Sequence, residues 1–149
     1  MPPLTLKAKA ISLYNSTTVK CESRGFTFTL QQSEENPEKN YAMNPMEALL
    51  CALGGCQVIT TINYAKKHNI DLEGVSVELE GEFDTDGILG IKDVRSGYSG
   101  ISCRLLLDTN ESSRKIDSLI KTLQEKAPVV DTINNPVKLQ IEAVTMSKH

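Results

Sequence analysis

The 149-residue sequence has no cluster of Lys and Arg interleaved with aromatic side chains, and its formal net charge is −3 with an isoelectric point near 5.4. A surface that binds phosphates needs concentrated positive charge, so we do not expect nucleic acid as a partner. The first residues lack the basic start and the apolar core of a signal peptide, and no uninterrupted apolar run of about 18 residues occurs. We therefore expect a cytoplasmic protein without a membrane partner.

Several chemical motifs are also missing. The four cysteines, at positions 21, 51, 56 and 103, have spacings that match no zinc-binding pattern. A reducing compartment would keep all four as thiols. There is no glycine-rich phosphate loop, no dinucleotide-binding glycine pattern and no G-x-S-x-G motif. We therefore expect neither a metal nor an organic cofactor.

The most informative stretch is a long apolar segment that carries a cysteine. Asn44 suits the N-cap of a helix, and Pro45 suits the first helical position, where no N–H is needed. Residues 66–68 are cationic or titratable and complement a helix C-terminus, and Asn69 can adopt the left-handed conformation that ends it. These signals predict a helix over residues 45–68, about 30 Å in length.

This helix is apolar on nearly all sides, since its few polar residues are spread around its circumference. A helix of this kind has to be enclosed, so we predict a central, buried helix. A domain of this size has little material with which to cover it. Part of the cover is therefore expected from a second copy of the chain, in a symmetric homodimer.

The remaining segments predict strands and one further helix. An antiparallel meander is expected over residues 4–14, 19–21 and 26–30, followed by a polar connection over 31–43. Apolar and polar residues alternate over 75–83 and 101–107, which indicates two strands, and the alternation places Cys103 on the core side. Between them, residues 85–98 are expected to form a mobile loop.

Helical spacing over 111–126 indicates a second, amphipathic helix capped by Asn110 and ended by Pro128, and alternation over 137–143 indicates a final strand. Strands in blocks with two unlike helices are typical of an α+β fold in which helices cover antiparallel strands. The length favours a single domain over residues 1–149.

The run from Asn44 to Leu50, followed by Gly54-Gly55-Cys56, resembles the signature helix of the OsmC/Ohr family of thiol peroxidases. The predicted order of elements agrees with that family over most of the chain. The resemblance implies an intertwined homodimer, a pocket between the subunits, and a helix cysteine that reduces organic or inorganic hydroperoxides. It implies that Cys56 is the reactive thiol and that external thiols regenerate it.

In the family a second cysteine, after the second helix, resolves the oxidised thiol. The matching position here is Ala127, which cannot form a disulfide. Cys51 lies five residues before Cys56 and points largely away from it on a helix. Cys103, on a strand expected to face the core, is the more plausible resolving thiol.

The family's peroxidases also carry a Glu ten residues before the reactive cysteine, where this chain has Met46. Glu47 is adjacent, but one helical step turns a side chain by about 100°. The family's thiolate-stabilising Arg has no counterpart at residues 15–18, and Arg24 is the nearest substitute. Glu47 and Arg24 are therefore secondary candidates for the site.

Two further readings stay open at the level of sequence. A non-catalytic ligand-binding or thiol redox-sensing module could keep the same fold without turnover, which fits the loss of the two family residues at Met46 and Ala127. A structural dimer with an inert core thiol is also compatible, since buried free cysteines commonly act as small hydrophobic residues.

Overall fold

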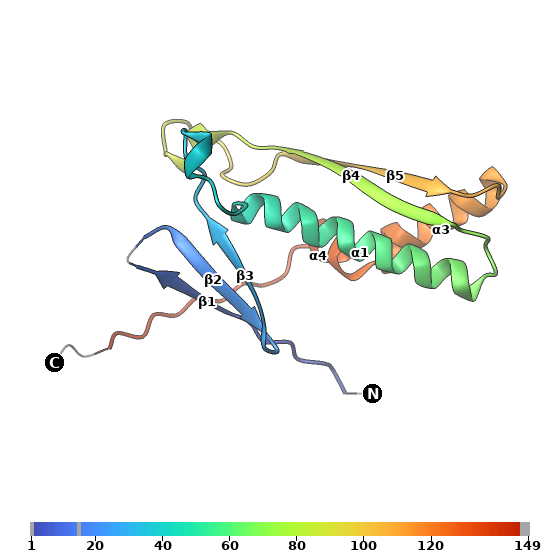
Figure 1. Ribbon diagram of the computed structural model, residues 1–149, viewed down its shortest axis with the longest axis horizontal. Coiled ribbons are helices and arrows are strands. Elements are labelled where there is room, and N and C mark those ends of the chain that lie inside the picture. The colour runs from blue at the N-terminus through green and yellow to red at the C-terminus, as the bar shows by residue number, and fades with distance from the viewer. Residues whose placement is uncertain (1, 15, 147–149) are drawn as a thin grey trace. The chain divides into compact units, whose positions relative to one another are not determined.

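Three short strands with β-branched and aromatic residues form an antiparallel meander near the N-terminus. In the computed structural model, which describes residues 2–14 and 16–146, these are β1 (Lys9–Leu13), β2 (Thr18–Ser23) and β3 (Phe26–Gln31), in that order in the sheet (Figure 1). Arg24 and Gly25 turn the chain between β2 and β3 with φ of 53° and 84°, as a tight hairpin requires. The three predicted strands are confirmed, although the first is shorter than expected and begins at Lys9, not at Leu4.

The long helix α1 (Pro45–Lys67) begins and ends where the sequence predicts. At its start, the Asn44 side chain accepts the Glu47 N–H at 2.8 Å, and the Glu47 carboxylate accepts the Asn44 N–H at 2.9 Å. This reciprocal capping box satisfies two backbone donors that the helix itself cannot use. At the other end, Asn69 has φ of 52° and provides the left-handed stop.

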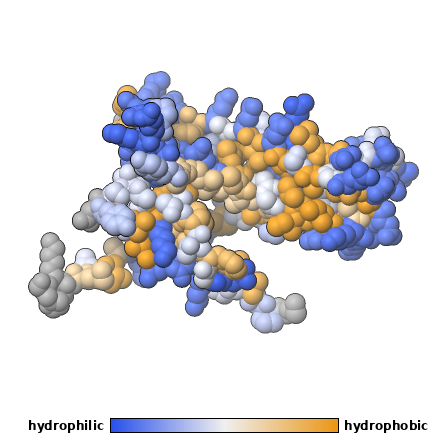
Figure 2. Space-filling model, in the orientation of Figure 1, coloured by the Kyte–Doolittle hydropathy of each residue, from blue (hydrophilic) through white to orange (hydrophobic). Residues whose placement is uncertain are grey.

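One side of α1 is buried, with Leu53, Gln57, Thr61 and Ala65 following one another at intervals of four. Ile59 on another side is 63% exposed, and hydrophobic surface is visible over this helix in Figure 2. The single chain therefore covers only one side of α1, and the predicted enclosure of the other sides by a second copy stays a prediction. By length and hydropathy α1 could also cross a bilayer, but core helices of soluble proteins share these properties.

Two longer strands, β4 (Gly74–Glu82) and β5 (Gly100–Asp108), pair with each other, as expected from their alternating residues. The connection between them is not a plain loop, because it contains the short helix α2 (Thr85–Ile88), capped by the Asp84 side chain. Cys103 on β5 is exposed, so the prediction that it faces the core is wrong.

The second amphipathic helix is α3 (Ser113–Lys126), and its N-cap is Ser112, not Asn110. α3 ends at Lys126, before Pro128, as predicted, but Pro128 also occupies the first position of a further helix, α4 (Pro128–Asn134), which the sequence did not predict. A proline is well suited to that position. Leu119 and Leu123 of α3 form a buried core with Ala127, which lies between the two helices.

The predicted final strand over residues 137–143 is wrong for the single chain. These residues have no strand or helix assignment, and Val137, Leu139 and Ile141 are 64%, 78% and 87% exposed. The alternating pattern is present in the sequence. A strand also needs a neighbour for its backbone N–H and C=O groups.

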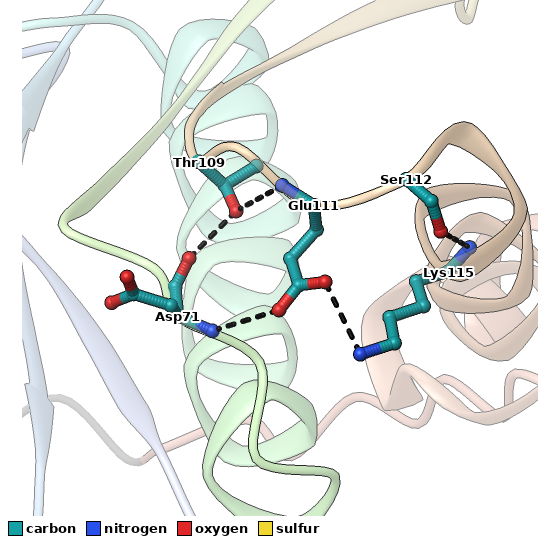
Figure 3. Close-up of polar contacts among 5 residues, drawn as sticks. All are labelled: Asp71, Thr109, Glu111, Ser112 and Lys115. Atoms are coloured by element: carbon teal, nitrogen blue, oxygen red, sulfur yellow. Dashed lines mark hydrogen bonds and ion pairs between the residues drawn. The ribbon is translucent and has the colours of Figure 1, made fainter.

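A polar network fixes the start of α3 (Figure 3). The Glu111 carboxylate pairs with Lys115 Nζ at 3.2 Å and accepts the Asp71 N–H at 3.3 Å, while the Thr109 hydroxyl donates to the Asp71 carbonyl at 2.6 Å. The hydrogen bond from Lys115, followed by that from Asp71, lowers the pKa of Glu111. The network ties the α1–β4 connection to the segment before α3.

The chain divides into two compact units, and the boundaries between them fall within α1, β4 and β5. The first unit comprises Met1–Gly54 and Glu78–Arg104, and the second comprises Gly55–Val77 and Leu105–His149. The first therefore holds the meander and the start of α1, and the second holds Cys56, α3 and α4. One domain over residues 1–149 stays a prediction.

Candidate functional site

Cys56 lies in the middle of α1 and is half-buried. It packs against the core of the second unit, formed by Leu119, Leu123 and Ala127. The same core is flanked by further partly buried side chains, among them Tyr64 and Val130. The thiol therefore has an apolar wall on one side and is not sealed from solvent.

One polar group of the backbone reaches the sulfur. The Val129 N–H donates to Cys56 Sγ, with 3.3 Å between nitrogen and sulfur. Val129 is the second residue of α4, where a helix has no internal acceptor for its N–H groups. Ala127, the N-cap residue, has no side chain that could take the bond. Cys56 Sγ therefore accepts the hydrogen bond from an N–H in the first turn of α4, a role that the side chain of a capping residue usually has.

A donor at this distance stabilises negative charge on sulfur, because hydrogen bonds to an ionised acceptor are stronger than those to a neutral one. The thiolate is the form of a cysteine that attacks peroxides, so a backbone donor in contact with the sulfur lies where negative charge would develop in that reaction. The sequence does not predict this contact when Pro128 is taken only as the end of the preceding helix. Its suitability for the first position of a new helix was the signal that could have found it.

The other predicted site residues lie in the first unit. Arg24 occupies the β2–β3 turn, where its guanidinium lies 5.5 Å from the centre of the Phe26 ring. Glu47 belongs to the capping box of α1, and Cys103 is exposed on β5. None of the three lies in the unit that contains Cys56, so their roles at the thiol stay predictions.

The first turn of α1 has a polar contact of its own. The Tyr98 hydroxyl donates to the Met46 carbonyl at 2.6 Å, and the Tyr98 ring packs edge-on against Phe83. Burial of the hydroxyl, and next the nearby charge of Glu47, raises the pKa of Tyr98. A neutral Tyr98 therefore links the segment after α2 to the start of α1 within the first unit.

The family model described as OsmC-like protein matches residues 36–142, which include α1, the β4–β5 pair, α3 and α4. The chain belongs to the OsmC family. The match confirms the family suggested by the Asn44 to Cys56 stretch. No curated protein matches the chain in sequence.

Solved structures of the OsmC family share the fold. An OsmC-like protein from Mycoplasma pneumoniae is 18% identical, with a TM-score of 0.78 and 89% of each chain covered. An organic hydroperoxide resistance protein OsmC from Legionella pneumophila is 18% identical, with a TM-score of 0.65 over 91% of this chain and 93% of the other. The organic hydroperoxide resistance protein OhrB of Bacillus subtilis is 17% identical, with a TM-score of 0.58, covering 89% and 93%. At these identities the likeness shows the α+β, OsmC-like fold.

Within the OsmC fold, the position of Ala127 has a clear structural role. Its side chain is fully buried in the α3–α4 core, in the cluster against which Cys56 packs. All four cysteines lie among the described residues, and Cys56 is the only one of them in the second unit. This unit therefore has a candidate reactive thiol and no second thiol to resolve it.

The first unit has an open apolar groove of about 620 Å³. Its wall includes Phe28 of β3, Tyr41 and Met43 of the connection, and Ala48 and Cys51 of α1. The exposed Cys51 thiol lies 3.9 Å from the Met43 sulfur. Apolar surface of this kind is available for contact with another molecule.

Proposed function

We propose that this OsmC-family protein is a thiol-dependent reductase of organic or inorganic hydroperoxides, with Cys56 as the reactive residue. The hydrogen bond from the Val129 N–H to Cys56 Sγ carries the proposal, because it places a donor where thiolate charge has to be stabilised. The half-buried position of Cys56 leaves the sulfur partly open to a small peroxide. The similar Legionella and Bacillus proteins are named for organic hydroperoxide resistance, which agrees with this reaction.

The reaction begins when the Cys56 thiolate attacks one oxygen of the peroxide. The O–O bond breaks, the sulfur becomes a sulfenic acid, and the other oxygen leaves as an alcohol or, from hydrogen peroxide, as water. One external thiol then condenses with the sulfenic acid and releases water, and a second thiol reduces the mixed disulfide. Two external thiols are thus consumed for each peroxide, with no metal or organic cofactor. The cytoplasm is the proposed compartment because it supplies reduced thiols.

We also propose a homodimer as the functional assembly. In the first unit, Phe26 and Phe28 on one face of the meander are 71% and 56% exposed. In the second unit, Ile59 of α1 and the alternating apolar residues of segment 137–143 are exposed as well. A second copy can cover these surfaces and give segment 137–143 a neighbouring strand. Sedimentation velocity at micromolar concentration would show a dimer, and a monomer there would contradict this assembly.

The direct test of the reaction combines reduced protein, an organic hydroperoxide and an excess of dithiol. We expect peroxide to disappear over many turnovers with the natural sequence and not with Cys56→Ser. Cys21→Ser serves as the matched control, because Cys21 lies on β2, outside the unit of Cys56. Mass spectrometry should find the first oxidation at Cys56. Peroxide loss that survives Cys56→Ser would contradict the proposed role of this thiol.

An alternative function is that of a redox-sensing module. It is favoured by the absence of a second thiol in the unit that contains Cys56. A sensor would be oxidised once for each molecule of protein and would not turn over with dithiol. The number of peroxide molecules consumed for each protein chain separates the two functions.

A further inference from the structure

We propose that oxidised Cys56 is captured by the backbone nitrogen of Val129, which forms a sulfenyl amide that links α1 to α4. This inference rests on the proposed function for the first oxidation step, and it concerns the fate of the sulfenic acid that this step produces. It assigns to a backbone amide the role of resolving group.

The geometry places this nitrogen next to the sulfur. The distance of 3.3 Å between Val129 N and Cys56 Sγ is already that of direct contact. Pro128 restricts the backbone just before Val129, and fully buried Ala127 anchors the segment in the α3–α4 core. The nitrogen is therefore held near the sulfur by the fold and does not need a loop to close over it.

The same N–H has no competing role in the helix. It belongs to the first turn of α4, where backbone donors lack intrahelical acceptors, and its partner is the cysteine sulfur. Formation of a bond to sulfur would cost α4 none of its own hydrogen bonds. The first of those runs from Asp131 N–H to the Ala127 carbonyl, two residues beyond Val129.

Competing fates are limited by the surroundings. The second unit contains no other cysteine, so a disulfide within it is impossible. Without a resolving group, a second peroxide oxidises a sulfenic acid to a sulfinic acid, which ordinary thiols do not reduce. An amide nitrogen in contact with the sulfur provides a reversible alternative.

The proposed step balances without any further oxidant. The hydroperoxide has already oxidised the sulfur, and the Val129 nitrogen then attacks it. The S–O bond breaks, and the leaving hydroxide takes the amide proton to form water. An external thiol later attacks the sulfur and breaks the S–N bond. The nitrogen regains a proton, and the resulting mixed disulfide is reduced by a second thiol.

The test follows the product of oxidation in a protein whose other three cysteines are changed to serine. After treatment with a stoichiometric organic hydroperoxide, the intact chain should be about 2 Da lighter than the reduced chain, because two hydrogens are lost. Tandem mass spectrometry should locate a cross-link between the peptides of Cys56 and Val129. Dithiol should restore the reduced mass.

Two variants at one position separate the cross-link from other effects. Val129→Ala keeps the N–H and should form the same species, whereas Val129→Pro has no N–H and should lose it. In Val129→Pro the oxidised sulfur should instead react with dimedone or proceed to a sulfinic acid about 32 Da heavier than the thiol. Only the final product is compared, after all Cys56 thiol has reacted, so a slower first step in the proline variant does not matter.

Two results would overturn the inference in different ways. Dimedone labelling of Cys56 that is equally complete in Val129→Ala and Val129→Pro, without a cross-link in either, would overturn the sulfenyl amide and leave the peroxide reaction intact. No oxidation of Cys56 in any variant would overturn the proposed function and this inference with it. The cross-link search in the Val129→Ala protein gives a result even if the proline variant does not fold.

Discussion

Two helices of the same unit begin in different ways. At the start of α3, the Ser112 hydroxyl accepts the Lys115 N–H at 3.4 Å, so a side chain next to the helix caps it. At the start of α4, the cap residue Ala127 offers no side chain, and the Val129 N–H goes to Cys56, 73 residues earlier in the chain. The first arrangement serves the helix alone, and the second connects a helix to a thiol.

The difference shows how a fold can assign a backbone donor to a reactive group. A serine in place of Ala127 could cap α4 locally and compete for its N–H groups. An alanine leaves the donor available to the sulfur and packs into the core at the same time. Ala127 thus replaces the second cysteine expected from the family, and because its side chain cannot cap α4, the Val129 N–H stays available to Cys56.

The largest effect is expected when a thiol is introduced at the N-cap of α4, where Ala127 now leaves the Val129 N–H to Cys56. In Ala127→Cys, we expect peroxide to produce a disulfide between Cys56 and the introduced thiol, which replaces the sulfenyl amide. The position is fully buried, so the added sulfur should lower the free energy of unfolding by about 1–3 kcal/mol. Denaturant unfolding measures the cost, and non-reducing peptide mapping detects the disulfide.

The same substitution in a Cys56→Ser background is the control, because it carries the packing cost without the partner thiol. Two thiols that stay separately alkylatable after peroxide treatment would show that the two positions do not meet in disulfide geometry.

A smaller effect is expected at the start of α3. Ser112→Ala removes the side-chain cap and should lower the free energy of unfolding by about 1 kcal/mol. The rate of Cys56 oxidation should stay the same, because the capped N–H belongs to another helix. Ser113→Ala is the matched control, since Ser113 is the first helical residue and its side chain makes no such bond. Equal costs for both substitutions would contradict a capping role for Ser112.

Local signals explain why α1 could be predicted at both ends. Asn44, Pro45, Glu47 and Asn69 each act within one turn of their own position, and the structure uses them in that way. The start of α3 was misplaced because Asn110 and Ser112 are both good caps, and local chemistry does not choose between them.

Long-range contacts explain what the sequence could not predict. On β5 the alternation gives the right side, because Ile101, Leu105 and Leu107 are half-buried, yet Cys103 on that same side is exposed. How far cover extends along a strand depends on long-range contacts, which alternation does not report. The pattern over 137–143 is that of a strand, but the described chain pairs it with no other strand. Cys56 was found from its helix motif, whereas its hydrogen bond depends on where α4 begins in space. A reactive residue can thus be identified from a local sequence motif, whereas the groups that surround it depend on contacts between distant parts of the chain.

The smallest predicted effect is a pH dependence at the start of α3. Because its folded-state pKa is lowered, Glu111 adds stability that is fully present above its ordinary pKa and is lost as the pH falls through the lowered value. Urea unfolding should therefore show a stability difference between the natural sequence and Glu111→Gln near neutral pH that disappears in acid. Glu125→Gln is the matched control, because Glu125 is exposed in the last turn of α3 and makes no ion pair in the described part of the chain. A difference that stays constant down to acid pH would show that Glu111 acts through packing or neutral hydrogen bonds and that the start of α3 does not depend on its charge.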